Sequence, residues 1–556
     1  MFGLLLSDRM GVGSEQVRTF GHSQINSMFR LVLLAILVAI LAVPAFAQSL
    51  RYSEAQLTIP PDGDLSGRLA AHGLQLGHAR IEDGRVQVIL SEDELAVVLE
   101  AGIEVTVMDR DLGATLAARP PFTDEQRAAA RAGGRIEGNI FGSLLGYPNF
   151  DEVVAILDEM HTLYPNLITV KTSLGQSIEG RDIWMVEISD NPGVDEEEGE
   201  VLYTALHHAR EPQGPATVLY YMWYLLEQYA TNSDVADLVD SRRMFFVPIV
   251  NPDGYVYNEL LDSDGQYPGW RKNCRVNSEG GLCCTLSNLG ACGVDLNRNY
   301  SYLWGYDDTG SSPNPGSGTY RGTAPFSEPE TSAMRGFLES GRQVSETFNY
   351  HTYSNLLLYP WSYENGAYTP DNDLFQMQAE AMTEVNGYTY GTSWEILYRV
   401  NGGSDDWMYG EQTTKPEILA YTPEVGNTFW PDPSLIIPLA DENLEANLLL
   451  AEYASVIVTG LVEDAREHPD GFVLGENYPN PFNPSTRIPF VLSESGEVVL
   501  TVFDVLGREV AVLVEGRLVA GSHAATFAAD GLSSGVYVAR LETAGQVQSR
   551  TMLLVK

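Results

Sequence analysis

Positive charge is scarce in this chain. Of its 556 residues, 33 are Lys or Arg and 75 are Asp or Glu, which gives a formal net charge of −42 at pH 7. The only lysines are Lys171, Lys272, Lys415 and Lys556. A protein that binds nucleic acid needs a basic surface to neutralise phosphates, so the composition argues against that class of partner. An acidic surface chiefly keeps a protein soluble.

Long hydrophobic runs are scarce as well. The apolar run Leu31–Val43 is shorter than the ~20 residues that a membrane-spanning helix needs. It follows Met28-Phe29-Arg30 and precedes Ala45-Phe46-Ala47, which is the order of segments in a secretory signal peptide. We therefore predict an extended n-region and signal peptide at residues 1–47. The mature chain is then secreted or held at the cell surface, with no transmembrane segment.

Cysteine is limited to one short loop, which contains Cys274, Cys283, Cys284 and Cys292. In an exported protein this pattern favours two disulfide bonds, and three pairings are open. A zinc ion bound by the four thiolates is the less favoured interpretation, because the spacing is not a Cys-x-x-Cys repeat.

The remaining composition is that of a folded protein with more than one domain. Apolar residues make up 44% of the chain and aromatic residues 10%, as in globular proteins. The length exceeds that of one ordinary hydrophobic core. Composition and patterning predict, after the signal peptide, a pro-region at 48–139, a central domain at 140–460, a polar linker at 461–475 and a β-sandwich at 476–556.

The proposed pro-region has the pattern of a small α+β unit. Strands are expected at 85–90 and 103–107, with a helix at 93–101 between them. A small, polar stretch with Arg127, Arg131 and Arg135 follows, so a maturation site or flexible connector is expected there.

The central domain alternates between strand-like and helix-like runs. This alternation predicts an α/β domain with a largely buried sheet. Helices are expected at 151–163, 216–229, 328–340, 371–386 and 440–458. Strands are expected at 168–170, 183–188, 201–205, 245–250, 348–350 and 418–422. Binding sites in such sheets gather at the carboxyl ends of strands.

Metal-ligating side chains follow two of these strands. His208 and Glu211 lie three residues apart at a strand-to-helix turn, and His351 follows the strand at 348–350. Two imidazoles and a carboxylate are the protein ligands of a catalytic zinc ion, which keeps a further position open for water. A lone His-x-x-Glu is common by chance, so the other motifs decide whether this is a metal site.

Further motifs occur in a fixed order along the central domain. In chain order they are Asn251-Pro252-Asp253-Gly254, Trp270-Arg271-Lys272-Asn273, Asp295-Leu296-Asn297-Arg298-Asn299, Tyr320-Arg321-Gly322, Phe326-Ser327-Glu328-Pro329-Glu330, Tyr398 to Trp407 with Gly402-Gly403, and Thr422-Pro423-Glu424. Each has a plain structural explanation when it is taken alone. Together they resemble the zinc carboxypeptidases of the carboxypeptidase A and carboxypeptidase T type, over residues 140–458. The resemblance implies a mixed-sheet α/β catalytic domain.

The resemblance also implies a role for each matched residue. The zinc ligands are His208, Glu211 and His351. Glu424 is the general base and acid, and Arg271 stabilises the oxyanion. The remaining matched positions bind substrate or support the site: Arg210 in a more distant subsite, Asn297, Arg298 and Tyr398 at the terminal carboxylate, and Asp295 as hydrogen-bond partner of His208.

Physical arguments support these roles independently. A carboxylate beside a zinc-activated water can take its proton and pass it to the leaving amine. A guanidinium fork suits a carboxylate, so Arg298 favours chain ends over internal bonds. A tyrosine on a glycine-hinged loop can close over bound substrate.

Asp405 is the residue that bears most directly on specificity. It follows Gly402-Gly403-Ser404, where the resemblance places the floor of the pocket for the terminal side chain. An Asp there resembles the basic-preferring members and the broad carboxypeptidase T type, and a buried negative charge favours terminal Arg or Lys. The alternative is that Asp405 points to solvent while Asp406 packs near Trp407.

Two features depart from the family pattern. Pro423 stands before Glu424, where an aromatic residue is common, so the strand end and the position of Glu424 are expected to shift. The cysteine loop between Arg271 and Asp295 is richer than in bacterial relatives. The resemblance also allows a structural calcium ion, although no ligand set for one stands out in the sequence.

The C-terminal segment carries a second resemblance. Asn477 to Thr486, Val502 to Val510 and Leu532 to Tyr537 are similar to the type IX secretion C-terminal sorting domain. The similarity implies export across two bacterial membranes and the secretion machinery as a partner. A plain β-sandwich accessory domain is the alternative.

The leading interpretation is a secreted zinc carboxypeptidase that acts on peptides with a free C-terminus. One alternative is a zinc amidase acting on cell-wall peptides or N-acyl amino acids, which can share the zinc ligands. The complete carboxylate clamp with Tyr398 argues against it. Another is a non-catalytic surface-binding homologue, and the intact ligands with Glu424 argue against that.

Overall fold

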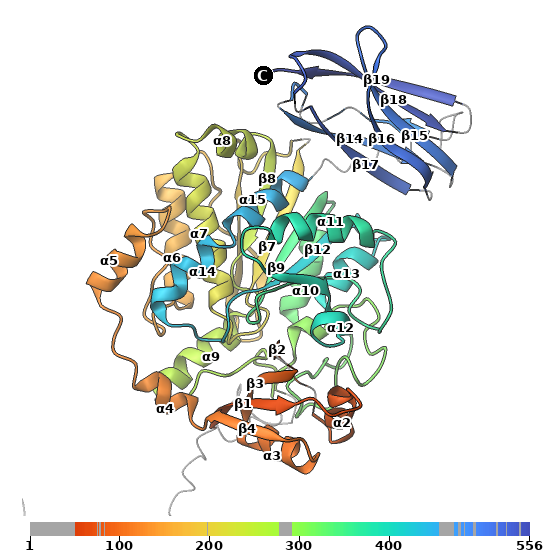
Figure 1. Cartoon of the computed structure of the whole chain (residues 1–556). Coiled ribbons are helices and arrows are strands. Elements are labelled where there is room, and N and C mark those ends of the chain that lie inside the picture. Colours follow the sequence, from red (N-terminus) through yellow and green to blue (C-terminus); the bar gives the residue numbers. More distant parts are fainter. Residues whose placement is uncertain are drawn as a thin grey trace, which may run out of the picture.

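The computed structural model describes residues 51–276, 292–454 and 472–556, apart from 75, 77, 78, 83, 197, 476, 478, 479, 483, 493–495, 519, 520, 530, 544 and 545. The predicted signal peptide, most of the cysteine loop and residues 461–471 of the predicted linker lie outside the described residues, whereas the end of that linker forms a strand of the third part. Three folded parts follow one another along the chain (Figure 1).

The first part is a small sheet covered by short helices. Its strand order is β2-β3-β1-β4. The strands are β1 (Tyr52–Thr58), β2 (Arg80–Glu82), β3 (Arg85–Ser91) and β4 (Val105–Asp109). Its helices are α2 (Leu65–Ala71), α3 (Glu92–Glu100) and α4 (Leu112–Ala117), whereas α5 (Asp124–Ala132) lies beside the central part, where it contacts the 3-10 turn at Pro433–Leu435 (Figure 1). The α3 helix begins where Ser91 and Glu94 form a capping box. The unit is α+β, as predicted, with two strands that the sequence pattern did not indicate.

The central part contains an eight-stranded mixed sheet, in the order β11-β10-β12-β9-β7-β8-β6-β5. The strands are β5 (Thr172–Gln176), β6 (Asp182–Ile188), β7 (Gly199–Ala205), β8 (Arg242–Val247), β9 (Val344–Tyr350), β10 (Leu356–Tyr359), β11 (Thr389–Thr392) and β12 (Leu419–Glu424). The predicted strand at 168–170 is wrong, because Ile168 forms only an isolated bridge to Ile188 and the edge strand begins at Thr172.

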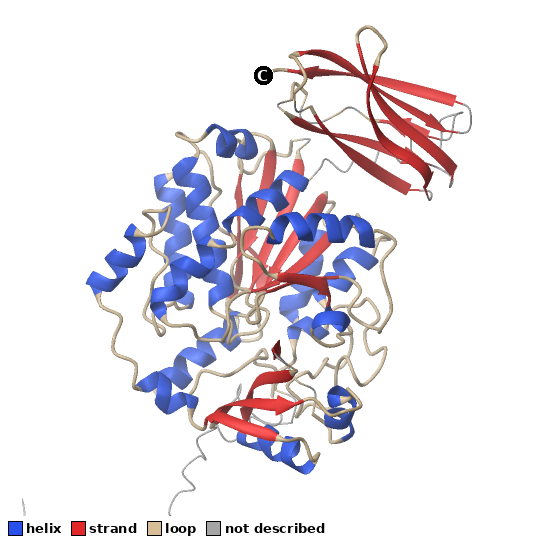
Figure 2. Cartoon of the chain, in the orientation of Figure 1, coloured by secondary structure: helices blue, strands red, loops and turns tan. Residues whose placement is uncertain are grey.

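Helices cover both faces of this sheet (Figure 2). The helices are α6 (Phe150–Leu163), α7 (Gln213–Gln228), α8 (Ser233–Val239), α9 (Pro252–Ser263), α10 (Pro329–Leu338), α11 (Asn372–Thr383), α12 (Ser393–Ile396), α13 (Ser404–Gly410), α14 (Ile436–Asp441) and α15 (Leu444–Tyr453), with 3-10 turns η2 (Leu296–Arg298) and η3 (Pro433–Leu435). The predicted helix at 440–458 is divided between α14 and α15.

Alternate residues of the strands divide the core into two layers. Val201 and Tyr203 of β7 belong to a large cluster with α6, α7 and α15, whereas Leu202 packs with α10 and α13 on the other face. A strand buried on both faces has no polar side, so its apolar run is nearly continuous.

Three parallel neighbours fix the place of the functional site. Strand β9 pairs with both β7 and β12, and all three run in the same direction. Their carboxyl ends therefore meet at one edge of the sheet, where open α/β sheets bind ligands. The chain leaves these ends at His208, His351 and Glu424.

The third part is a β-sandwich. One sheet has the order β13-β14-β17 and the other β16-β15-β18-β19. The strands are β13 (Phe472–Leu474), β14 (Ser485–Leu492), β15 (Gly496–Asp504), β16 (Glu509–Leu518), β17 (Gly521–Ala528), β18 (Gly535–Thr543) and β19 (Gln546–Leu554). Buried residues from both sheets, such as Phe490 and Leu500, form its own core. In the described part of the chain, no helix has the length and apolar character needed to cross a membrane.

Candidate metal centre and substrate pocket

A sharp turn at the end of β7 carries the first two candidate ligands. Leu206 has φ +60°, a conformation that a branched side chain rarely adopts. Its carbonyl accepts a hydrogen bond from Asn251, and the next turn is fixed by Ala209 N, which donates to Arg271 O at 3.0 Å. The chain then enters α7, so that His208 and Glu211 face the same point.

Gly254 in the Asn251-Pro252-Asp253-Gly254 motif allows this packing. A Cβ at Gly254 would lie 2.5 Å from Lys272 O and 2.8 Å from the Ala209 side chain. Any other residue would push the segment carrying Arg271 away from the turn that carries His208. The motif therefore has a structural reason to be where it is.

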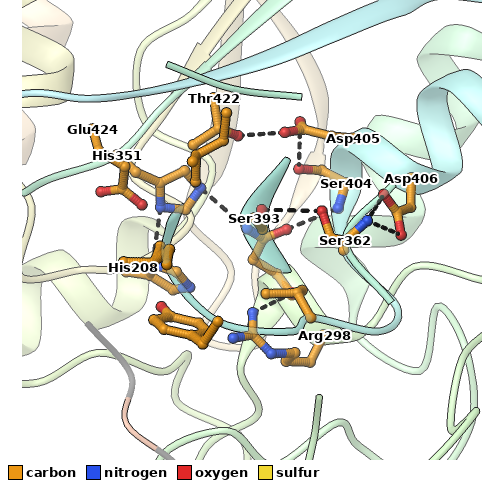
Figure 3. Close-up of a pocket in the computed structure, with 16 residues that line it drawn as sticks. His208, Arg298, His351, Ser362, Ser393, Ser404, Asp405, Asp406, Thr422 and Glu424 are labelled. Carbon is orange, nitrogen blue, oxygen red and sulfur yellow. Dashed lines mark hydrogen bonds between the residues drawn. The ribbon is translucent and has the colours of Figure 1, made fainter. Parts of the chain in front are cut away.

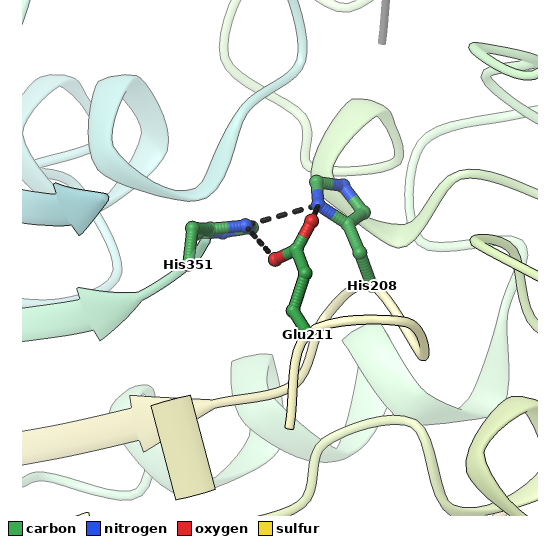
Figure 4. A group of neighbouring side chains, drawn as sticks. All are labelled: His208, Glu211 and His351. Carbon is green, nitrogen blue, oxygen red and sulfur yellow. Dashed lines mark hydrogen bonds and ion pairs between the residues drawn. The ribbon is translucent and has the colours of Figure 1, made fainter. Parts of the chain in front are cut away.

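His208, Glu211 and His351 converge (Figure 4). Glu211 lies between the two rings: its Oε1 is 2.9 Å from His208 Nδ1 and its Oε2 is 2.9 Å from His351 Nδ1. The two Nδ1 atoms are 3.0 Å apart. All three residues are buried, with at most 2% of their surface exposed.

These donor atoms fit a zinc ion. In tetrahedral coordination with bonds of about 2.0–2.1 Å, neighbouring ligand atoms are about 3.3 Å apart. Here the two Nδ1 atoms are 3.0 Å apart and each lies 2.9 Å from its nearest Glu211 oxygen, which approaches that separation. Neutral imidazole and carboxylate are also ligands that zinc prefers. Burial lowers the pKa of His351 to about 4, which keeps its ring neutral. The chemistry of the donor set therefore matches the metal that the sequence predicts.

Asp295 holds His208 and two arginines. His208 Nε2 donates to Asp295 Oδ1 at 3.0 Å, so Nδ1, which faces Glu211 and His351, is the ring nitrogen that would bind a metal. Arg271 donates to Asp295 Oδ2 from Nη2 at 2.8 Å, and Arg298 Nη1 lies 3.9 Å from the same oxygen. Burial opposes charge on Asp295, but the two guanidinium groups hold the pKa of this carboxyl well below its usual range.

Arg271 and Glu424 flank the metal position. The Arg271 Nη1 atom lies 3.2 Å from His208 Nδ1. Glu424 is the last residue of β12, is 3% exposed and forms a bridge with His351. Burial, followed by the nearby Glu211 carboxylate, raises the pKa of Glu424 well above its usual range. A divalent cation beside it would oppose that shift.

Pro423 does not end the strand, in contrast to the shift expected there. Strand β12 continues to Glu424, and Pro423 O accepts a hydrogen bond from His351 N at 2.9 Å. The proline supplies an acceptor at this position rather than a donor, which suffices to join β12 to the ligand-bearing end of β9.

A pocket opens beside the metal ligands (Figure 3). Its walls come from segments far apart in the chain. They include His208, Asn297, Arg298, His351, Leu358, Ser362, Ser393, Leu397, Tyr398, Val400, Gly403, Ser404, Asp405, Asp406, Thr422 and Glu424. Figure 3 shows His208, His351 and Glu424 at one side and Asp405 and Asp406 at the other.

Cationic and polar groups line the part of the pocket nearest the metal ligands. Arg298 is 2% exposed, and its buried Nε has no hydrogen-bond partner among the described residues. Asn297 accepts a hydrogen bond from Ser404 N at 2.8 Å. Burial raises the pKa of Tyr398 to about 12, although Arg271 and Arg298 nearby oppose that rise. The predicted clamp residues are thus together, with an unused donor among them.

Asp405 lies in the pocket and not at the outer surface. Only 9% of it is exposed, and its carboxylate accepts hydrogen bonds from Asn349 Nδ2 and Thr422 Oγ1. Burial raises its pKa to about 6. Asp406 accepts from Ser362 N at 3.0 and 3.1 Å, and burial raises its pKa to about 8.

Arg210 is not one of the residues that line this pocket, and it lies beside the N-terminal unit. Its guanidinium stacks over the Phe429 ring, 4.1 Å from the centroid. Tyr52 of the N-terminal unit packs against Tyr267, with ring centroids 5.1 Å apart, and Ser354 donates to Ala79 O at 3.2 Å. The N-terminal unit therefore covers the central domain close to Arg210 and His351.

Sequence reasoning missed the residues that hold Asp405 and shape the far wall of the pocket. These are Asn349, Ser362, Ser393 and Thr422. Asn349 has the only signal that was available, since it faces the same sheet edge two residues before His351. The others have ordinary strand or loop contexts.

Two further predictions concern metal and disulfide chemistry. Asp190, Glu196 and Glu198 form a second acidic group in the described residues, and calcium binding stays a prediction. Cys274 and Cys292 are buried, while Cys283 and Cys284 lie outside the described residues. The disulfide pairing also stays a prediction.

Comparisons with known proteins agree with this geometry. Residues 153–446 match the family described as zinc carboxypeptidase, and residues 476–556 match the secretion system C-terminal sorting domain. A zinc carboxypeptidase of Saccharothrix mutabilis subsp. capreolus is 34% identical over 327 residues, 56% of this chain and 70% of that protein.

Two further matches come from animals. Carboxypeptidase B of Astacus astacus is 34% identical over 318 residues, 55% of this chain and 96% of that protein. The crystal structure of carboxypeptidase A from Helicoverpa armigera aligns with a TM-score of 0.59 and 24% identity, over 74% of this chain and 99% of that one. At that identity the structural match concerns the fold alone.

Proposed function

Because this chain belongs to the zinc carboxypeptidase family, we propose that it removes single residues from the free C-termini of peptides and proteins, with a preference for terminal Arg or Lys. Its C-terminal sorting domain supports secretion or export to the cell surface. The observation that carries the proposal is the buried pocket that runs from the His208–Glu211–His351 cluster to Asp405.

His208, Glu211 and His351 are the residues that hold the zinc ion in this proposal. Bound zinc supplies a Lewis acid for the scissile carbonyl and lowers the pKa of an attached water to about 7. Asp295 orients His208 through Nε2, so that Nδ1 faces the ion. Asp295 is therefore a positioning residue.

Glu424 moves the proton. Its carboxylate accepts a proton from the attacking water and returns it to the nitrogen of the leaving amino acid, so that an amine leaves and not an amide anion. Arg271, fixed by Asp295, donates to the oxyanion that develops on the scissile carbonyl.

Arg298, Asn297 and Tyr398 bind the terminal carboxylate. The free Nε of Arg298 and its planar guanidinium suit a carboxylate, which only a chain end provides. An internal peptide bond offers no anion at this place and leaves the arginine unpaired. Arg210 borders the subsite for residues further from the end.

Asp405 receives the side chain of the terminal residue. Its two oxygens are anchored by Asn349 and Thr422 on the protein side, and the residue still lines the pocket. A guanidinium or ammonium group entering the pocket offsets the cost of a buried negative charge, whereas an apolar side chain does not.

The outer segments control export and activation in this proposal. Residues 1–47 direct export and are removed, residues 48–139 are a pro-region that covers the subsites near Arg210, and 140–460 are the catalytic domain. Residues 461–475 link it to the sorting domain at 476–556, which engages the secretion machinery. Arg127 and Arg131 lie on helix α5 (Asp124–Ala132) and not on the flexible connector predicted there. In this proposal, cleavage near Arg127, Arg131 or Arg135 frees the catalytic domain.

Mass spectrometry of peptide digests tests the proposal. The full chain is loaded with zinc and assayed before and after limited trypsin treatment. Peptides ending in Arg, Leu or Glu are supplied as free acids and as C-terminal amides. Chelator-sensitive loss of one residue from the free acids, fastest for Arg, is expected. Cleavage of amides would favour the amidase alternative, and no cleavage by the zinc-loaded, trypsin-treated protein would favour a binding role.

A further inference from the structure

Tyr398 sits on a partly exposed segment with backbone hydrogen bonds on both sides of it: Leu397 N donates to Ser393 O at 2.9 Å, and Val400 N donates to Ser362 O at 2.8 Å. Gly402 has φ +70°, and its carbonyl accepts a hydrogen bond from Tyr300 N at 3.0 Å. A Cβ at Gly402 would lie 2.5 Å from Arg298 O. On the amino side, residues 396–400 are partly exposed. The position of the phenol therefore also depends on what restrains the side chains of the segment at 399–401, directly after Tyr398.

Asp307 is the group that restrains it. Asp307 Oδ2 lies 3.0 Å from Arg399 Nη1, and Asp307 Oδ1 accepts from Asn401 Nδ2 at 2.9 Å. The Asp307 carbonyl also accepts from Asn401 Nδ2, at 3.2 Å. One aspartate thus holds the two residues at positions +1 and +3 from Tyr398.

The loop that carries Asp307 is itself braced from inside the domain. Asp307 Oδ1 accepts from Thr309 N and Gly310 N, both at 2.9 Å, which closes a tight turn. Buried Arg321 donates to the Asp307 carbonyl at 2.7 Å and to Ser311 Oγ at 2.9 Å. Ser311 donates in turn to buried Asn401. The anchor for Tyr398 is therefore continuous with the core.

We propose that Asp307 is a positioning residue that holds the Tyr398 segment closed over the substrate pocket through Arg399 and Asn401. Asp307 is not among the described residues that line the pocket, so we assign it a role through Tyr398 rather than in direct contact with substrate. The ion pair with Arg399 is partly exposed, at 28% and 27% of the side chains, which makes it weak enough to open and re-form. The inference rests on the role proposed above for Tyr398.

The substitution Asp307→Asn isolates this contact. Asparagine keeps an acceptor for Thr309 N and Gly310 N but loses the charge that pairs with Arg399. Asp308→Asn is the matched control, because Asp308 pairs with Arg321 and is 71% exposed. The Arg399→Gln variant breaks the same ion pair from the other side and guards against misfolding of the Asp307 turn.

Hydrogen exchange on the full chain measures how firmly Asp307 holds the segment that carries Tyr398, and it needs no enzyme assay. Amides at 397–401 are expected to exchange about tenfold faster in D307N and R399Q than in the wild type and D308N, while β9 amides stay unchanged. Equal exchange in all four proteins would overturn the proposal. If D307N and R399Q exchange faster but the wild type hydrolyses no peptide, the positioning role of Asp307 stands and the proposed function is rejected.

Kinetics with furylacryloyl-Ala-Arg, after trypsin treatment, then tests whether Asp307 acts through Tyr398. D307N is expected to raise KM about tenfold with kcat changed less than about twofold. In a Y398F background D307N should add less than about twofold, since the group it positions is gone. An equal rise in KM in both backgrounds would refute the assignment.

Discussion

The candidate metal ligands and the part of the pocket around Asp405 are adjacent, yet they are built on different kinds of backbone. His208, His351 and Glu424 leave the ends of three adjacent parallel strands, whose pairing fixes their spacing. Asp405 begins a short helix, and Tyr398 lies on a glycine-hinged loop. A sheet edge fixes atoms that must stay in place during chemistry, whereas a helix end and a loop can vary without disturbing that edge.

The largest expected effect breaks the chemistry and leaves the pocket intact. Glu424→Gln removes the proton acceptor, so kcat should fall about 10³-fold with KM nearly unchanged. Steady-state kinetics with bound zinc measured in parallel checks this. Glu346→Gln changes another buried glutamate, on β9, and serves as the control. If kcat of E424Q decreases by less than tenfold, the proton transfer must be assigned to another group.

The next effect breaks the pocket and leaves the chemistry intact. Asp405→Ala removes the buried charge, so the ratio of kcat/KM for Arg-ended over Leu-ended peptides should fall about 100-fold. The exposed Asp373→Ala variant on α11 is the matched control. An unchanged ratio in D405A would show that Asp405 does not receive the terminal side chain.

A third prediction separates metal binding from catalysis. Asp295→Asn weakens the acceptor that orients His208, so zinc affinity should fall about 10- to 100-fold. Competition with a chromogenic chelator gives the dissociation constant directly. Asp253→Asn is the control, because Asp253 is equally buried but bonds to Ser177 and Arg181. Equal affinities in all three proteins would remove Asp295 from the metal site.

The smallest expected effect is the pH dependence of the preference for Arg-ended over Leu-ended peptides. Burial raises the pKa of Asp405 to about 6. Its negative charge is therefore present above about pH 6 and is lost as the pH falls through that value. The Arg/Leu ratio should be constant above about pH 7 and decline by severalfold towards pH 5. Glu424 affects both substrates alike and cancels in the ratio. Asp405→Asn should give a flat, low ratio at every pH, and a wild-type ratio that does not change would contradict the prediction.

The strand-end residues were the most predictable part of the site. The spacing of His208 and Glu211 is local, and His351 follows a recognisable strand, so the pattern alone indicates three ligands at one sheet edge. The edge strand was the least predictable: Ile168 to Val170 has strand-like residues, yet only one bridge forms there. A short apolar run does not reveal whether it has a neighbour to pair with.

The contacts of the pocket lay beyond the sequence pattern. Asn349 donates to Asp405 across 56 positions of the chain, and Thr422 donates from a third element 17 positions away. Asp307 and Arg399 are joined by an ion pair across a still longer stretch of the chain. Thr422 and Arg399 lie within motifs of the sequence, but no spacing in those motifs indicates these partners.

Local spacing and the strand and helix periods predict a candidate metal site in an α/β domain, because both depend on short stretches of the chain. The resemblance of further motifs adds the zinc carboxypeptidase family and the C-terminal sorting domain. Only the tertiary structure decided that Asp405 is buried within the pocket, that Asp295 bridges His208 and Arg271, and that Asp307 restrains the segment bearing Tyr398. These depend on which sheet edges and loops meet in space, and that is fixed by the packing of the whole domain.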